Sequence, residues 1–139
     1  MSEESTTPDL VELVREAAQA MNRGDLDLAI SFWNADCRVE NAATAVTDNR
    51  CVGWAGLRKW YSDIFDAFAE GARFEVEEIL AITENFVVAR VAIVGQGVRS
   101  GAPLQFRYTN VYWFSDGKIT RGVGYNSRRE ALSAVGLEG

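Results

Sequence analysis

The segment from residue 103 to residue 127 constrains the fold of this 139-residue chain most strongly. Two runs rich in β-branched and aromatic residues flank the tetrapeptide Ser-Asp-Gly-Lys at residues 115–118. Glycine at a central position of such a turn allows the positive φ that a tight hairpin needs. The segment therefore predicts a long antiparallel β-hairpin, over which the upstream part of the chain closes.

The first arm of this hairpin alternates between two kinds of face. One face carries aromatic side chains around a central amide: Phe106, Tyr108, Asn110, Tyr112 and Phe114. The opposite face includes Val111 and Trp113, which are too apolar to face water. Because a sheet that is apolar on both faces is covered on both, we expect helices of the chain on one face and a second copy on the other. The sequence thus predicts a homodimer.

Charge and hydropathy exclude several classes of partner. The formal net charge is −6, and the acidic residues are spread along the chain. Such a surface repels phosphate backbones, and there is no basic stripe with interleaved aromatics, so we expect no nucleic-acid binding. No apolar run approaches the length that spans a bilayer, and the first ten residues are polar and acidic. We therefore expect a cytoplasmic protein without a signal peptide or membrane partner.

The chain has no histidine and only two cysteines, Cys37 and Cys51. The lack of histidine removes the commonest general base, the Ser-His and Cys-His nucleophile systems, and the commonest zinc ligand. Two isolated cysteines are too few for a metal site. We expect reduced thiols, with a disulfide across the short intervening segment as the alternative. No metal and no cofactor are predicted.

Helical periodicity is strongest in the first half of the chain. A Thr-Pro start at Thr7 precedes an amphipathic pattern over residues 8–22, and a shorter helix after Asp25 includes Phe32 and Trp33. A third predicted helix, residues 54–69, carries an apolar stripe wide enough to pack flat on a sheet. The residues of this stripe are Leu57, Trp60, Tyr61, Ile64, Phe65 and Phe68.

Strands and one terminal helix complete the expected order. After a disordered lead-in at residues 1–6, the later elements are a strand at 37–41, a surface loop at 42–50, strands at 74–83 and 86–99, the hairpin, and a helix capped by Ser127. This order predicts one α+β domain over residues 1–139. We expect a curved mixed, mainly antiparallel sheet wrapped around helices to form a cone with an internal pocket.

Five short segments together resemble a known family. They are Asn-Arg-Gly-Asp-Leu at 22–26, Val-Glu-Asn at 39–41, Gly-Leu-Arg-Lys-Trp at 56–60, Phe-Glu-Val-Glu-Glu at 74–78 and Phe-Ser-Asp-Gly-Lys-Ile at 114–119. Their order is similar to the SnoaL-like branch of the nuclear-transport-factor-2-like superfamily. That family includes ketosteroid isomerases, polyketide cyclases, limonene epoxide hydrolases, scytalone dehydratases, and non-enzymatic transport and assembly domains. The resemblance implies the fold more firmly than any activity.

The resemblance to ketosteroid isomerases carries over only in part. Asn41 stands where those enzymes place a general-base aspartate, and an amide has no useful basicity. Asn110 stands where they place a protonated aspartate that binds an oxyanion, and an amide still donates a hydrogen bond. Ala17 replaces their first-helix tyrosine. The resemblance therefore argues against a steroid isomerase.

The resemblance to limonene epoxide hydrolases is also partial. Asn41 matches an asparagine that helps to hold water there, and Arg90 matches their third-strand arginine. Ala92 and Gly124, however, replace the two carboxylates of that mechanism. The histidine that many SnoaL-like cyclases carry near the position of Gly122 is also missing.

These comparisons define the candidate site. The catalytic candidates are Asn41, Arg90, Tyr108 and Asn110, and the substrate-binding candidates are Trp60, Ile64, Tyr112, Gly122, Gly124 and Asn126. Family parity turns Arg90 and Ala92 inward, and a buried guanidinium needs a partner. That partner is either an internal carboxylate, Glu75 or Glu77, or an anionic ligand. The two strand glycines either leave room for a ligand or relieve a bend.

Two function classes fit this pocket. The first is an isomerase-, cyclase-, dehydratase- or hydrolase-type enzyme that acts on a small hydrophobic metabolite. The second is a non-catalytic ligand-binding or accessory domain, since the family's catalytic His and Asp residues are absent. We favour the first, with a small hydrophobic or weakly anionic ligand in an apolar pocket that has a few fixed polar groups.

Overall fold

A single curved sheet of six strands organises the described part of the chain. The computed structural model describes residues 9–41, 50–66, 73–96 and 101–137. The strands are β1 (Trp33–Asn41), β2 (Arg50–Val52), β3 (Arg73–Ile82), β4 (Phe86–Gln96), β5 (Pro103–Ser115) and β6 (Lys118–Tyr125). They lie in the order β2-β1-β6-β5-β4-β3, with β1 parallel to β6 and the other neighbours antiparallel. The predicted α+β class with a mixed, mainly antiparallel sheet is confirmed.

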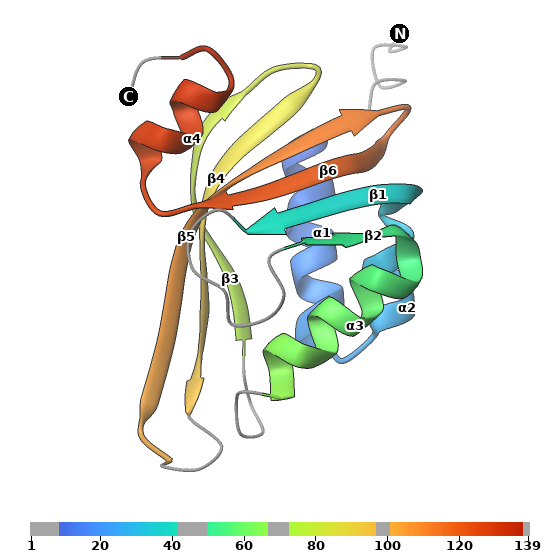
Figure 1. Ribbon diagram of the computed structural model, residues 1–139, viewed down its shortest axis with the longest axis vertical. Helices are drawn as coiled ribbons and strands as arrows, with labels where there is room; N and C mark the ends of the chain where they lie inside the picture. The colour runs from blue at the N-terminus through green and yellow to red at the C-terminus, as the bar shows by residue number, and fades with distance from the viewer. Residues whose placement is uncertain (1–8, 42–49, 67–72, 97–100, 138–139) are drawn as a thin grey trace, which may run out of the picture.

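The helices lie on both sides of this sheet (Figure 1). They are α1 (Leu10–Asn22), α2 (Leu26–Ser31), α3 (Gly53–Asp66) and α4 (Arg128–Ala134). On the inner side, α1 packs against β3, and α3 packs against β1 and β2. Helix α4 contacts β4, β5 and β6 on the opposite, outer side. None of the helices in the described ranges is both long and apolar enough to cross a membrane.

The predicted hairpin is present as β5 and β6. Its turn has a positive φ at both central residues, 52° at Asp116 and 76° at Gly117. Positive values at both positions define the type I′ turn, whose twist matches that of the flanking strands. The local sequence therefore sets how β5 pairs with β6 at the turn between them.

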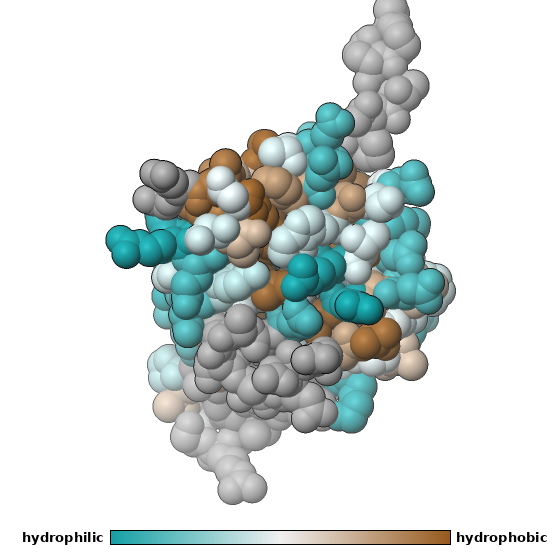
Figure 2. Space-filling view, turned by 45° about the horizontal axis from the view of Figure 1, so that its top comes forward, coloured by the Kyte–Doolittle hydropathy of each residue, from teal (hydrophilic) through white to brown (hydrophobic). Residues whose placement is uncertain are grey.

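The alternation along β5 separates two cores, as the sequence predicts. Tyr108, Tyr112 and Phe114 pack into the inner core together with residues of α1 and α3. Val111 packs into an outer core with Val88 of β4 and Ala131 of α4. Apolar side chains also gather at the surface in the region of α4 (Figure 2). A helix of the same chain thus covers the part of the outer face around Val111, for which we expected a second copy.

The structure corrects two element boundaries. Trp33 begins β1 instead of ending the second helix, because the carbonyl of the preceding residue, Phe32, accepts a bond of 3.0 Å from the Ile119 amide of β6. This bond draws the chain into the sheet directly after α2. The N-cap of α1 is Asp9, whose carboxylate accepts from the Glu12 amide at 3.3 Å. The predicted cap Thr7 lies outside the described residues, as does most of the predicted loop at 42–50. The C-terminal ends of the predicted 54–69 helix and 86–99 strand lie outside them as well.

Other local expectations are met. Ser127 caps α4 by accepting from the Glu130 amide at 3.2 Å. Cys37 and Cys51 are free thiols. Burial raises the pKa of both thiols, to about 11 for Cys51, so neither is an activated nucleophile near neutral pH.

Candidate functional site

A narrow apolar cavity lies between α3 and the inner face of the sheet. Its empty space, mouth included, is about 470 Å³, and about 40 Å³ of this can hold the centres of water molecules. That is room for a few waters, since one water needs at least about 10–15 Å³ by the same measure. The lining residues are Trp33, Val39, Glu40, Trp60, Tyr61, Phe74, Ile93, Tyr108, Asn110, Tyr112, Gly122, Val123 and Gly124.

The amide of Asn110 and the phenol of Tyr112 form a polar pair on this wall. They are two residues apart on β5, so they share a face, and Asn110 Nδ2 donates to Tyr112 Oη at 2.9 Å. Burial raises the pKa of Tyr112 to about 12, although the bond from Asn110 opposes this shift. Tyr112 is therefore a neutral phenol at physiological pH, and its own O–H remains to be donated elsewhere.

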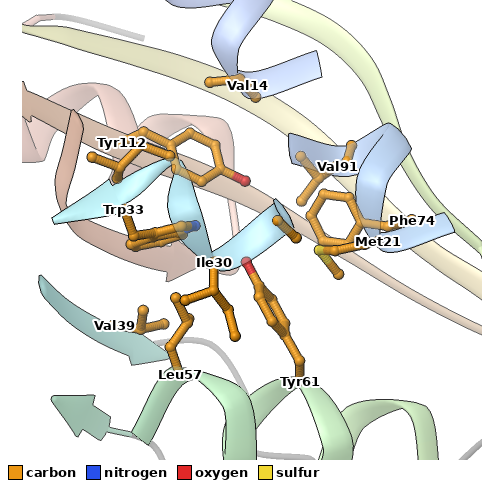
Figure 3. Packing of buried hydrophobic residues seen from close by; sticks show 14 of the residues in the cluster. Val14, Met21, Ile30, Trp33, Val39, Leu57, Tyr61, Phe74, Val91 and Tyr112 are labelled. Atoms are coloured by element: carbon orange, nitrogen blue, oxygen red, sulfur yellow. The ribbon is translucent and has the colours of Figure 1, made fainter. Parts of the chain in front are cut away.

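Tyr61 and Trp33 complete a cluster of polar tips inside the apolar core. Figure 3 shows the hydroxyls of Tyr61 and Tyr112 and the indole nitrogen of Trp33 pointing toward a common space. Burial, followed by the nearby Tyr112, raises the pKa of Tyr61 far above its ordinary value. The Trp33 N–H is close enough to Tyr61 to oppose this shift, but it does not reach the oxygen with hydrogen-bond geometry. The cluster is therefore uncharged near neutral pH.

Six of the ten predicted site residues lie around this cavity: Trp60, Tyr108, Asn110, Tyr112, Gly122 and Gly124. Asn41 ends β1, where its backbone pairs with Gly124, and Ile64 belongs to α3. The side chains of Asn41 and Ile64 lie outside what the structure describes. The other two predicted residues, Arg90 and Asn126, are not at the cavity.

Arg90 lies on the outer face of the sheet, so the expectation that it faces the cavity is wrong. The flanking β4 residues Ala89 and Val91 pack into the inner core, and strand alternation therefore turns Arg90 the other way. Its backbone partners are Glu78 of β3 and Thr109 of β5. The side chain of Ala92, two residues further along β4, faces the outer side by the same alternation. The parity carried over from the family does not hold for this strand.

The carboxylates that were considered as partners of Arg90 are engaged on that outer face. Arg107 Nε and Nη2 donate to Glu77 Oε1 and Oε2, both at 3.1 Å. The bond to Arg107 is the main reason that the pKa of Glu77 is lowered, and the charge of Arg90 adds to it. Glu75 lies within 3.8 Å of Arg73. Arg90 thus belongs to a surface array of charges.

Asn126 and Gly122 also differ from expectation. Strand β6 ends at Tyr125, so Asn126 is an exposed residue just before the cap of α4. A Cβ atom at Gly122 would lie 2.8 Å from Cη2 and 3.3 Å from Cζ3 of Trp33. Glycine is therefore needed at this position to make room for a protein side chain, which was neither of the two explanations that we considered.

Sequence reasoning missed several lining residues. The sequence pattern places Trp33 in a helix and Tyr61 in the core, whereas both line the cavity. The signal for Trp33 was present: apolar residues at 33, 37 and 39 share the parity of a strand whose one face is buried. Tyr61 carries no such signal, because its hydroxyl lies beside Tyr112 only through the packing of α3 on the sheet.

The arrangement supplies hydrogen-bond donors and apolar walls. Glu40 lines the cavity, but its carboxylate accepts from Arg121 Nη2 at 3.0 Å, and the two side chains are partly exposed to solvent. In the described ranges, no three His, Cys, Asp or Glu side chains converge to hold a metal ion. The described site is thus suited to bind oxygen atoms of an uncharged or anionic ligand.

Solved structures with the same fold include an epoxide hydrolase/cyclase-like enzyme and two proteins crystallised with small molecules. SalBIII, an epoxide hydrolase/cyclase-like enzyme with a role in pyran ring formation in the polyether salinomycin, has a TM-score of 0.70 and 16% identity over 92% of this chain and 95% of its own. TerC, co-crystallised with polyporic acid, has a TM-score of 0.71 and 15% identity over 92% and 96%. A protein of ketosteroid isomerase-like fold from Catenulispora acidiphila, in complex with trimethylamine, has a TM-score of 0.67 and 18% identity over 94% and 95%.

At these identities the structural matches establish the fold alone. A search of curated proteins gave no match to this sequence. The family model of the SnoaL-like domain, however, matches residues 14–122, which include the cavity lining from Trp33 to Gly122. The chain therefore belongs to the SnoaL-like domain family.

Proposed function

We propose that this protein binds a small hydrophobic molecule in the cavity and acts on it as a cofactor-independent isomerase, cyclase, dehydratase or hydrolase. The observation that carries this proposal is the Asn110–Tyr112 pair, bonded at 2.9 Å, on an otherwise apolar wall. Apolar walls with a few fixed polar groups are the usual form of a small-molecule site. Membership of a family whose structural relatives include a cyclase-like enzyme also supports it.

The chemistry follows from what the polar pair can donate. Asn110 has a second amide N–H, and Tyr112 has its own O–H, to offer to an oxygen of the ligand. Donors held in a water-poor site stabilise negative charge that develops on such an oxygen during ring closure, isomerisation or ring opening. Because Tyr112 keeps its proton up to a pKa of about 12, it serves as a donor or acid and not as a base.

A second candidate function is ligand binding without turnover. Glu40, the carboxylate residue among the described lining residues, pairs with Arg121. A site without a free base supports an accessory or carrier role, in which the donors orient a ligand but move no proton.

We also propose that two copies of the chain pair through the part of the outer face that α4 leaves open. Trp113 supports this pairing, because it lies half-buried on that face with the Arg121 guanidinium carbon 4.7 Å from its ring centroid. A large aromatic side chain flanked by an arginine is typical of the centre of an interface.

The experiment is a binding and turnover assay with a ring hydrocarbon, a ring ketone and a ring epoxide, followed through the methyl signals of Val39 and Ile93. Saturable shifts are expected in the wild type and loss of binding in Val39→Trp, which fills the cavity. Val52→Trp is the matched control, since Val52 lies on the adjacent strand and is 60% exposed. Ile93→Phe is a milder second variant if Val39→Trp does not fold. Binding with product formation supports an enzyme, binding without product supports the accessory role, and no saturable binding rejects both.

A further inference from the structure

Two buried indole N–H groups at the cavity make no hydrogen bond of acceptable geometry, although the Trp33 N–H lies near the Tyr61 hydroxyl. They are Nε1 of Trp33 and Nε1 of Trp60, which stand out among the buried side-chain nitrogens and oxygens of the described residues. Both side chains line the cavity, and Trp33 as a whole is only 4% exposed. Trp33 lies on β1 and Trp60 on α3, so two different elements bring these indoles to the cavity lining.

The other two tryptophans of the chain show that this feature is specific to the cavity. Trp54 Nε1 donates to the Trp33 carbonyl oxygen at 2.9 Å. Trp113 lies on the outer face of the sheet, where its ring stacks with Arg121. The fold thus satisfies or exposes the tryptophans that lie elsewhere and leaves those at the cavity unpaired.

An unpaired buried donor implies a ligand or a water molecule. Leaving such a group without a partner costs about 1–3 kcal/mol. An indole nitrogen donates and cannot accept, so its complement must be an acceptor atom. A separate space of about 20 Å³, also lined by Trp33, Tyr61 and Tyr112, is large enough for one water. Water in that space is the competing explanation for Trp33.

The surroundings restrict the chemistry of the acceptor. The hydroxyls of Tyr61 and Tyr112 point into the same region as the Trp33 nitrogen and are neutral phenols (Figure 3). The Glu40 carboxylate is engaged by Arg121, so the described lining offers no free carboxylate to neutralise a bound cation. A set of neutral donors among aromatic walls fits an oxygen that has lone pairs and no proton of its own, attached to a flat apolar body.

We propose that the indole N–H groups of Trp33 and Trp60 are the oxygen-binding donors of this cavity, and that its ligand is a hydrophobic ring compound bound through a ketone oxygen. This inference rests on the proposed function, because it specifies the ligand of the same cavity. It assigns an oxygen-binding role to two tryptophans on different elements, in addition to the Asn110–Tyr112 pair.

The test compares indanone with indane, which has the same ring skeleton without the oxygen. Binding is followed in the two-dimensional indole N–H spectrum of isotope-labelled protein, in which the four tryptophans give one signal each. Single Trp→Phe variants assign the signals. Indanone is expected to move the signals of Trp33 and Trp60 downfield, while indane leaves them in place. The indole signals of Trp54 and Trp113 are internal controls, and neither compound is expected to shift them.

A variant provides the quantitative readout. Trp60→Phe keeps an aromatic ring but removes the donor, and one neutral hydrogen bond corresponds to about a threefold to tenfold loss of indanone affinity. In Trp60→Phe the affinity for indanone is expected to fall more than the affinity for indane, which loses only contact with the outer ring. Both affinities are expected to stay the same in the control Trp113→Phe. Thermal melting checks that each variant is folded.

The outcomes separate this inference from the proposed function. If both compounds bind with equal affinity and the indole signals do not move, the cavity binds ligands but its indoles do not hold the oxygen, and the inference fails alone. A Trp33 signal that responds to neither compound while Trp60 responds would assign water to Trp33 and overturn its half of the proposal. If neither compound binds, the inference fails, and the assay with other ring compounds decides the proposed function.

Discussion

The side-chain amide of Asn22 holds the backbone of Phe74 by two hydrogen bonds. Asn22 Nδ2 donates to the Phe74 carbonyl at 2.9 Å, and the Phe74 amide donates to Asn22 Oδ1 at 2.7 Å. The pair joins the last residue of α1 to the second residue of β3, 52 positions further along the chain. Because Phe74 lines the cavity, this link also fixes one wall of the site.

We therefore expect Asn22→Ala to destabilise the fold by about 2 kcal/mol, because it removes two bonds and leaves partly buried backbone groups unpaired. Asn34→Ala is the matched control, since the bond that the Asn34 side chain accepts from the Asp36 amide at 2.8 Å is local and exposed. Denaturant unfolding measures both changes. Equal losses in the two variants would show that the Asn22 link contributes no special stability.

The ring of Trp33 packs so closely against Gly122 that it leaves no room for a side chain there. Gly122→Ala places a methyl group where the ring edge of Trp33 lies, 2.8 Å from Cη2. We expect a loss of about 1–3 kcal/mol, as for other overpacked cores. In the Trp33→Phe background, which lacks the outer ring, the same substitution should cost much less. A double-mutant cycle from denaturant unfolding gives the coupling, and additive effects would contradict this packing.

Much of the fold is encoded in local pattern. The hairpin turn, the alternation of β5 and the cap at Ser127 depend on neighbouring residues, and each is found where the sequence predicts it. The start of β1 is different, because it depends on the bond between Ile119 and Phe32, which are far apart in the sequence. The alternation of apolar residues at 33, 37 and 39 is compatible with a strand, but periodicity alone does not show that this bond starts the strand at Trp33.

The candidate site was less predictable for a similar reason. Asn110 and Tyr112 share a face by alternation along one strand, so sequence reasoning places them together. To predict where Arg90 points, one must know which residues of a different strand, β4, face inward. An error of one residue in that assignment moves every side chain of the strand to the other face. The role of Gly122 depends on Trp33, which reaches it through the parallel pairing of β1 with β6.

The buried phenols predict a loss of stability at high pH. The folded pKa of Tyr112 is about 12, and that of Tyr61 is raised further, against about 10 for an unfolded tyrosine. The folded state therefore holds these protons more tightly. Their contribution is fully present below pH of about 10 and is lost as the pH rises from about 10 through 12.

Absorbance of the phenolate during an alkaline titration measures this effect. In native protein, Tyr61 and Tyr112 should resist ionisation at a pH where all four tyrosines ionise in denaturant, and Tyr125, whose pKa burial also raises, should add to the delayed titration. Tyr112→Phe should remove one of the resistant groups. If all four native tyrosines titrate together near the unfolded value, Tyr61 and Tyr112 are open to solvent and the cluster at the cavity is wrong.

The proposed pairing through the outer face predicts that Trp113→Glu is monomeric. A carboxylate in place of a half-buried aromatic ring would be desolvated in the interface without a partner. Light scattering measures the mass of both proteins. Trp54→Glu is the control, because Trp54 is also partly exposed, at 46%, but belongs to α3. A monomeric wild type would reject the pairing and leave α4 as the cover of the outer apolar face.

The last prediction concerns Arg90, for which the sequence and the structure give opposite expectations. A guanidinium in the cavity would make Arg90→Met weaken the binding of anionic ring compounds strongly. Because Arg90 lies on the outer face between Glu78 and Thr109, we expect no change in affinity for indanone or for an indane carboxylate. The stability change should also be small, since surface charge interactions such as that of Arg90 with Glu77 contribute about 0–1 kcal/mol.

A second readout shows where the charge of Arg90 acts. The pKa of Glu77 is lowered mainly by its hydrogen bonds to Arg107 and to a lesser degree by Arg90. Its carboxyl titration, followed by nuclear magnetic resonance, should therefore move toward the ordinary value in both variants, and further in Arg107→Met than in Arg90→Met. Since the folded pKa is the lower one, the associated stability is present at neutral pH and is lost as the pH falls through it. If Arg90→Met instead loses affinity for anionic ring compounds and leaves the Glu77 titration unchanged, the Arg90 side chain faces the cavity and its placement on the outer face is wrong.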